Sequence, residues 1–215
     1  MIQLQCSFLT FRNYLMNETT VDLSAPSKDV SSLFYPHGGL MIWMFVVLEL
    51  LVFGMAFGVY FYLKNQEPNL FYESQAHLNQ QLATINTLLL ISSGYVLAIA
   101  NRGYKQFSSK TTALLILITA TLGIAFLIIK LSEYKEKMDA GLNLGVNSFY
   151  DVYWLLTGFH AAHVLVGIII LFYFSYLFFS NKHNSEGDTN FDTVAVYWHM
   201  CDIIWILLFP IIYLL

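Results

Sequence analysis

The sequence predicts an all-α integral membrane protein in which five transmembrane helices form one bundle. Three observations lead to this fold class: 57% of the 215 residues are apolar, only 11% are charged, and the apolar residues gather in five long runs. Soluble domains carry roughly 25% charged residues, and a soluble chain of this length cannot bury so much apolar surface. The formal net charge of −4 gives no basic surface for a nucleic-acid backbone. An ordinary soluble enzyme, a disordered chain and a nucleic-acid binder are therefore excluded.

Each of the five runs is long enough to cross a bilayer, which requires about 20 mostly apolar residues. The runs cover residues 38–63, 81–100, 111–131, 151–179 and 192–215. They are continuous rather than alternating in polarity, which excludes a transmembrane β-barrel. We therefore expect a polar amino-terminal arm, residues 1–37, followed by a single five-helix membrane domain, residues 38–215.

Lysine and arginine are unevenly divided between the two sides of the expected bundle. Six of the ten fall on the side of the amino terminus, namely Arg12, Lys28, Arg102, Lys105, Lys110 and Lys182. Because these residues accumulate in cytoplasmic loops, we expect the amino terminus in the cytoplasm. Five spans then place the carboxyl terminus outside.

Glu49 lies near the middle of the first expected span, where a charge costs roughly 2.5–3.5 kcal/mol on insertion scales. It is either a proton carrier or ion ligand, or a buried carboxyl that fixes helix packing, and packing is the commoner use. At about 1.5 Å of rise per residue, Glu49, His163 and Asp202 lie at overlapping depths. We expect Glu49 to point into the bundle and to share a hydrogen bond with His163 or, failing that, with His199.

His160 and His163 are three residues apart in the fourth span, so both are expected on one side of that helix. Imidazoles at this spacing can bind a metal or a haem iron. Haem ligation, however, usually needs histidines that face each other from separate helices, and His199 is the only other histidine in a span. Packing is therefore favoured, and we expect no catalytic, cofactor-binding or metal site in this chain.

The last span carries a second polar pair. His199 and Asp202 share a helix face, and Trp198, Asp202 and Trp205 form a stripe along it. The pair can relay protons, or it can be a hydrogen-bonded knot that locks the helix into its bundle, and the knot is favoured.

Further polar residues lie in the second span and at the end of the third. Asn86 is expected to hydrogen-bond to a neighbouring helix or to its own backbone. Lys130, Glu133 and Tyr134 close the third span, where Lys130 is expected to reach the interface as part of an exposed ion pair. These residues indicate a bundle with a polar interior and contain no catalytic motif.

Five motifs, one in each span and in the same order, resemble subunit III of the haem–copper oxidases. They are Trp43…Glu49…Phe53, the run from Asn86 to Gly94, Glu133-Tyr134, Thr157-Gly158-Phe159-His160 with His163, and Tyr197-Trp198-His199 with Asp202 and Trp205. Three further features resemble the NorE-type branch, which is encoded with bacterial nitric oxide reductases. These are Ser74-Gln75 with Leu78-Asn79, Lys130, and Leu208-Phe209-Pro210.

The resemblance implies an accessory subunit without a redox centre, in the bacterial cytoplasmic (inner) membrane. It implies packing against a catalytic subunit I, or against a nitric oxide reductase large subunit, with haem and copper in that partner. It also implies bound phospholipid and a role in stabilising the catalytic subunit and supporting proton uptake. Two other classes remain as alternatives: an independent transporter or proton channel using Glu49, His163 and Asp202, which predicts helices broken near mid-membrane, and a haem b membrane protein.

Overall fold

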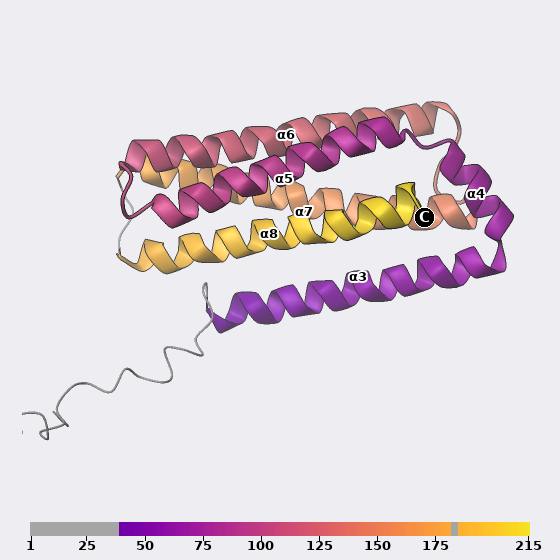
Figure 1. Cartoon of the computed structure of the whole chain (residues 1–215), viewed down its shortest axis with the longest axis horizontal. Coiled ribbons are helices and arrows are strands. Elements are labelled where there is room, and N and C mark those ends of the chain that lie inside the picture. Colours follow the sequence, from indigo (N-terminus) through magenta and orange to yellow (C-terminus); the bar gives the residue numbers. More distant parts are fainter. Residues whose placement is uncertain (1–38, 182–184) are drawn as a thin grey trace, which may run out of the picture. The chain divides into compact units, whose positions relative to one another are not determined.

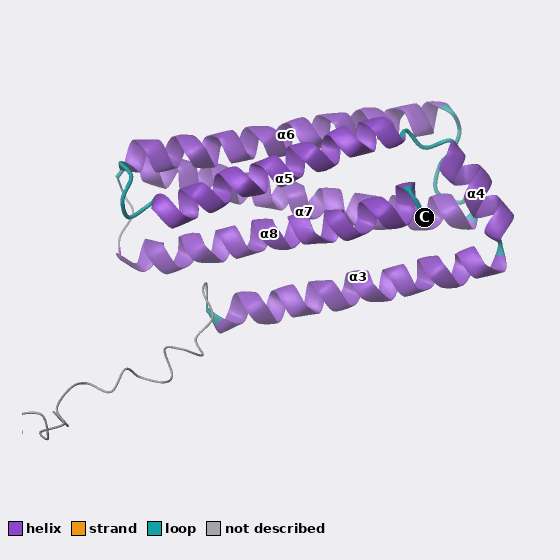
Figure 2. Ribbon diagram, in the orientation of Figure 1, coloured by secondary structure: helices purple, strands orange, loops and turns teal. Residues whose placement is uncertain are grey.

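The computed structural model of the chain describes residues 39–181 and 185–215, and for residues 185–190 it describes the backbone alone. Within these ranges the chain consists of helices and short connections, without a strand (Figure 2). The expected arm of residues 1–37 lies outside the described residues, as do Arg12, Lys28 and Lys182 of the charge count. The prediction for the arm therefore stays a prediction.

The described residues contain five long helices: α3 (Leu40–Gln66), α5 (Gln80–Gly103), α6 (Ser109–Asp139), α7 (Ser148–Phe179) and α8 (Ser185–Tyr213). Each is long and apolar enough to cross a membrane, in α8 through the segment Phe191–Tyr213. The prediction of a five-helix membrane bundle is confirmed. A short helix, α4 (Pro68–Ala76), was not expected; it begins at a proline, which suits the first turn of a helix because that position needs no N–H donor.

Three of the long helices begin after a side chain that caps them. The side-chain oxygen of Asn79 accepts from the Leu82 N–H, that of Ser108 from the Thr111 N–H and that of Asn147 from the Tyr150 N–H, at 3.1, 3.2 and 2.9 Å. Such caps satisfy N–H groups that have no partner within the helix. They therefore fix where α5, α6 and α7 begin.

Helices α5 to α8 form the inner part of the bundle, and α3 lies outside it (Figure 1). Each of α5 and α7 packs against both α6 and α8, whereas α3 packs against α7 and α8. The inner helices are also the more buried: in the most apolar 18-residue segment of α8, 56% is buried in the protein, against 22% in that of α3. Most of α3 therefore faces the surroundings of the chain, and its contact with α7 is one of its few attachments.

The indole of Trp198 fills the centre of the bundle where three helices approach one another closely. Its Nε1 donates to Ser93 Oγ of α5 at 3.0 Å. A Cβ atom added to Gly123 of α6 would lie 2.7 Å from the indole, and one added to Gly167 of α7 would lie 2.8 Å from it. Both glycines are needed because the tryptophan occupies the space that a side chain would take.

Replacing Gly167 with alanine is expected to destabilise the bundle by about 1–3 kcal/mol, the usual cost of an overpacked core. Gly58→Ala is the matched control, because nothing lies within 4 Å of the Cβ that it adds. Thermal unfolding of the two variants in detergent measures the difference. Equal stability of the two would contradict the close packing of Trp198.

Candidate functional site

Glu49 and His163 meet at the contact between α3 and α7. Glu49 Oε2 lies 3.4 Å from His163 Nε2, and the two side chains are 9% and 12% exposed. The structure thus brings together the two residues for which the sequence predicts a contact. Tyr197 of α8 closes the same region, since its hydroxyl donates to the His163 carbonyl oxygen at 3.0 Å.

The hydrogen bond of Nδ1, the second ring nitrogen of His163, determines how many protons Glu49 and His163 share. Nδ1 lies 2.8 Å from the carbonyl oxygen of Phe159, which can only accept, so Nδ1 carries a proton. Nε2 then attracts Glu49 only if one more proton lies between them, either on the imidazole or on the carboxyl. Glu49 and His163 can therefore share one proton. The distance between Oε2 and Nε2 is long for a strong hydrogen bond.

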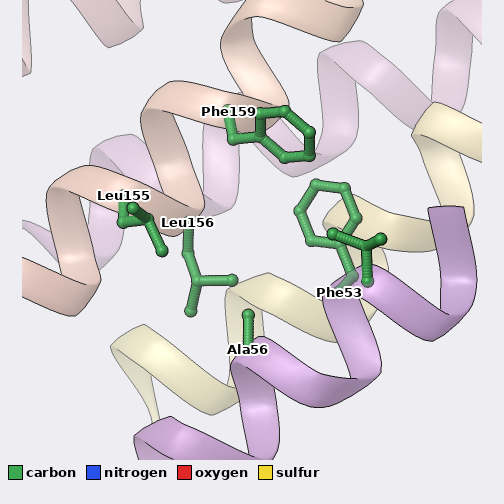
Figure 3. A pocket seen from close by; sticks show the side chains of 6 residues that line it. Phe53, Ala56, Leu155, Leu156 and Phe159 are labelled. Carbon is green, nitrogen blue, oxygen red and sulfur yellow. The ribbon is translucent and has the colours of Figure 1, made fainter.

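Two neighbouring hollows that share a lining residue follow the contact between α3 and α7. One, of about 360 Å³, is lined by Phe45, Glu49, Phe159, Ala162, His163, Val166 and Tyr197. The other, of about 240 Å³, is lined by apolar side chains from both helices, with the rings of Phe53 and Phe159 5.4 Å apart (Figure 3). Phe159 belongs to both. The polar pair therefore lies at one end of a mainly apolar groove.

A second polar cluster ties α6 to α7 and α8, and its centre is Lys130. Lys130 Nζ donates to Glu133 Oε2 at 3.0 Å, to the Tyr153 hydroxyl at 3.2 Å and to the Tyr213 hydroxyl at 2.5 Å. The two hydroxyls donate in turn to Glu133 Oε1, at 3.0 Å from Tyr153 and 2.8 Å from Tyr213. All three N–H groups of the ammonium have acceptors, and both carboxylate oxygens have donors.

The expectation of an exposed ion pair at Lys130 is wrong. The residues Lys130 and Glu133 are each only 1% exposed. Helix α6 continues to Asp139, about 13 Å beyond Lys130 at 1.5 Å per residue, so this lysine lies well inside the helix. Its Nζ also lies 4.9 to 5.5 Å from the ring centroids of Tyr134, Tyr153, Trp205 and Tyr213, an arrangement that favours a cation.

Tyr153 and Tyr213 are members of this cluster that the sequence pattern does not predict. Each lies in an otherwise apolar stretch, and both are buried. Their hydroxyls require a polar partner when they are buried, which was the only available signal. The sequence does not reveal which of the fourteen tyrosines meet the lysine.

His199 and Asp202 form the pair that their spacing suggested. His199 Nδ1 lies 3.3 Å from Asp202 Oδ2, but the His199 side chain is 40% exposed, whereas that of Asp202 is 10% exposed. A Cβ atom on Gly94 would lie only 2.1 Å from Asp202 Oδ2, so α5 passes directly over the carboxylate. Asp202 therefore faces α5, and His199 lies at the surface of this chain.

His160 and His163 do not act together. The side chain of His160 is fully buried and stacks on Trp205 with 5.1 Å between ring centroids, whereas His163 faces α3. Three residues turn a helix by about 300°, which leaves the two rings far enough apart to meet different neighbours. Among the described residues, no three His, Cys, Asp or Glu side chains gather closely enough to hold a metal ion.

The transporter hypothesis is not supported by the helices. Helices α5, α6 and α7 run without interruption from end to end. In α8 the proline inside the helix is Pro210, three residues before its last residue. No described span is therefore broken near its middle, as that hypothesis requires.

Comparison with known proteins identifies the family. The sequence model of cytochrome c oxidase subunit III matches residues 4–215. Cytochrome c oxidase subunit 3 of Thermostichus vulcanus is 32% identical over 180 residues, 82% of this chain and 86% of that protein. Quinol oxidase subunit 3 of Bacillus subtilis is 26% identical over 179 residues, 82% and 86% of the two chains. Heme-copper oxidase subunit I+III of Aeropyrum pernix is 29% identical over 180 residues, 80% of this chain but only 22% of that longer protein. The chain belongs to the cytochrome c oxidase subunit III family.

Proposed function

We propose that the chain is the non-redox accessory subunit of a respiratory haem–copper oxidase complex and that it stabilises the catalytic subunit against which it packs. The observation that carries this proposal is the family match, which spans residues 4–215 and thus every described helix. Relatives named for cytochrome c and for quinol oxidases support a role that does not depend on the electron donor.

The proposed partner is a subunit I. In Aeropyrum pernix the related sequence is part of one protein named subunit I+III, and a fusion of this kind supports direct packing of the two parts. The resemblance to the NorE-type branch adds a nitric oxide reductase large subunit as the second candidate partner. In the oxidase complex, haem and copper would belong to subunit I.

Purification of the complex in mild detergent, followed by identification of the large subunit that accompanies the chain, tests the proposal. A haem–copper oxidase subunit I supports the oxygen-reducing complex, and a nitric oxide reductase subunit supports the other branch. Recovery of the chain as a homo-oligomer, from membranes that contain both large subunits, would contradict both.

We propose further that the chain spans the bacterial cytoplasmic membrane with its amino terminus inside, and that phospholipid occupies the groove between α3 and α7. The lysine and arginine distribution supports the orientation, and the apolar lining of the groove supports acyl chains. Alkaline phosphatase fused after residue 143 should then be active, because it is exported, and the same fusion after residue 106 should be inactive. The reverse result would overturn the orientation.

The isolated chain is expected to bind neither haem nor copper. The reason is that His160 stacks on Trp205 and His163 faces Glu49, so no pair of histidines faces one another across the described bundle. A visible spectrum of the purified chain, with metal analysis, checks this. A Soret band that scales one to one with the polypeptide, free of subunit I, would show the haem b alternative to be correct.

A further inference from the structure

His160 lies in the centre of the inner bundle with unused hydrogen-bonding capacity. Its side chain is fully buried, and neither ring nitrogen has a hydrogen-bond partner among the described residues. One face of the ring stacks on Trp205 at 5.1 Å, and Phe126 meets it edge-on at 5.8 Å. Both neighbours are rings that leave the imidazole nitrogens unsatisfied.

Asn86 of α5 is in the same condition, so the expectation that it bonds to a neighbouring helix or to its own backbone is wrong for the described residues. It is 1% exposed, and neither its Oδ1 nor its Nδ2 has a partner among the described side chains and backbone. Buried polar groups in native proteins almost always have a partner, either in the protein or in ordered water. Four such atoms on two side chains therefore require an explanation.

The register of the helices places Asn86 at the level of His160. Thr119 Oγ1 of α6 lies 3.5 Å from the Ser93 carbonyl oxygen of α5. The two helices are antiparallel, so a step of seven residues along each, nearly two turns, leads from Ser93 to Asn86 and from Thr119 to Phe126. Asn86 thus lies opposite Phe126, whose ring contacts His160.

Three polar side chains near this layer already have partners. The Trp205 indole donates to Thr87 Oγ1 at 3.0 Å, and the Thr87 hydroxyl donates to the Ala83 carbonyl oxygen. Lys130, one turn beyond Phe126 on α6, uses its three N–H groups within its own cluster. Asn86 and His160, in contrast, have unused donors and acceptors.

We propose that Asn86 and His160 bind a water molecule between them at the centre of the α5–α8 bundle. A buried water needs two to four polar partners. The asparagine amide offers a donor and an acceptor, and a neutral imidazole offers one of each. Water is the ligand class that matches this set, because it both donates and accepts and is small enough for a packed interior. The site links α5 to α7, two helices that lie diagonally across the bundle.

The test is density for ordered water in the complex that contains the full chain, together with two variants. The expected result is a peak within 2.7–3.2 Å of an Asn86 amide atom and of a His160 ring nitrogen. The peak should be lost in Asn86→Leu. Asn86→Leu and His160→Phe should each lower the melting temperature by about 2–4 °C, and the double variant should lose less than the sum.

Asn143→Leu is the control, because Asn143 is exposed in the connection between α6 and α7 and its replacement should leave both the peak and the melting temperature unchanged. A direct hydrogen bond between the amide and the imidazole, or a dry contact, would overturn the proposal. The density of the wild-type complex decides between these outcomes even if a variant fails to assemble.

Discussion

Replacing Lys130 with methionine is expected to lower the stability of the bundle by about 3–5 kcal/mol, the cost of breaking a buried ion pair from one side. The loss arises because Glu133 would keep its charge in the interior without the ammonium. The hydroxyls of Tyr153 and Tyr213 would also lose the donor at 3.2 and 2.5 Å that holds them. Unfolding of the purified complex by denaturing detergent measures the change.

Lys135→Met is the matched control, since Lys135 is exposed on the same helix and should change stability little. The double variant Lys130→Met with Glu133→Leu should lose less than the sum of the two single changes, because it removes both charges together. Equal stability of Lys130→Met and Lys135→Met would show that the cluster does not hold α6 to α7 and α8.

The second large effect is expected at the contact between α3 and α7. His163→Leu leaves Glu49 without its partner and should cost about 1–3 kcal/mol. The loss should be smaller when it is combined with Glu49→Gln, because a neutral amide is less costly to leave unpaired than a carboxylate. A double-mutant cycle on the stability of the complex measures this coupling, while electron transfer in the intact complex should change little.

Glu73→Gln provides the control for the charge change, because Glu73 is exposed on α4. Strict additivity of the Glu49 and His163 variants would show that the 3.4 Å contact carries no coupling. Because α3 has few other attachments, the same variants should release α3 from α7 before the inner four helices separate. Proteolysis at the connection of α3 to α4 can detect that order.

The spans were predictable because each depends on local composition. About 20 apolar residues in succession have one stable arrangement in a bilayer, a helix that satisfies its own backbone. The meeting of Glu49 with His163 was predictable for a related reason. In spans that run parallel or antiparallel, the depth of a residue in the membrane follows from its position in the span. A carboxyl in the middle of the membrane has few polar partners at its own depth.

Lys130 shows where composition misleads. The apolar run ends at residue 131, which suggested a helix end and a lysine in the interface. Helix α6 continues to Asp139 through a segment in which Glu, Lys and Met, which favour helices, predominate. The end of the apolar run and the end of the helix therefore differ. Hydropathy indicates where the apolar run ends but does not indicate where the helix ends.

The sequence by itself determined the class of the protein, its five spans and the polar residues that required partners. The tertiary structure decided which partners they have: Tyr153 and Tyr213 for Lys130, α3 for His163, and Trp205 and Phe126 for His160. The physical reason lies in rotation about the helix axis. Successive side chains point about 100° apart around a helix. The burial of a side chain and the identity of its partner therefore depend on how neighbouring helices are rotated about their axes. That rotation is set by close contacts such as those of Gly123 and Gly167 with Trp198, which exist only once the helices have packed.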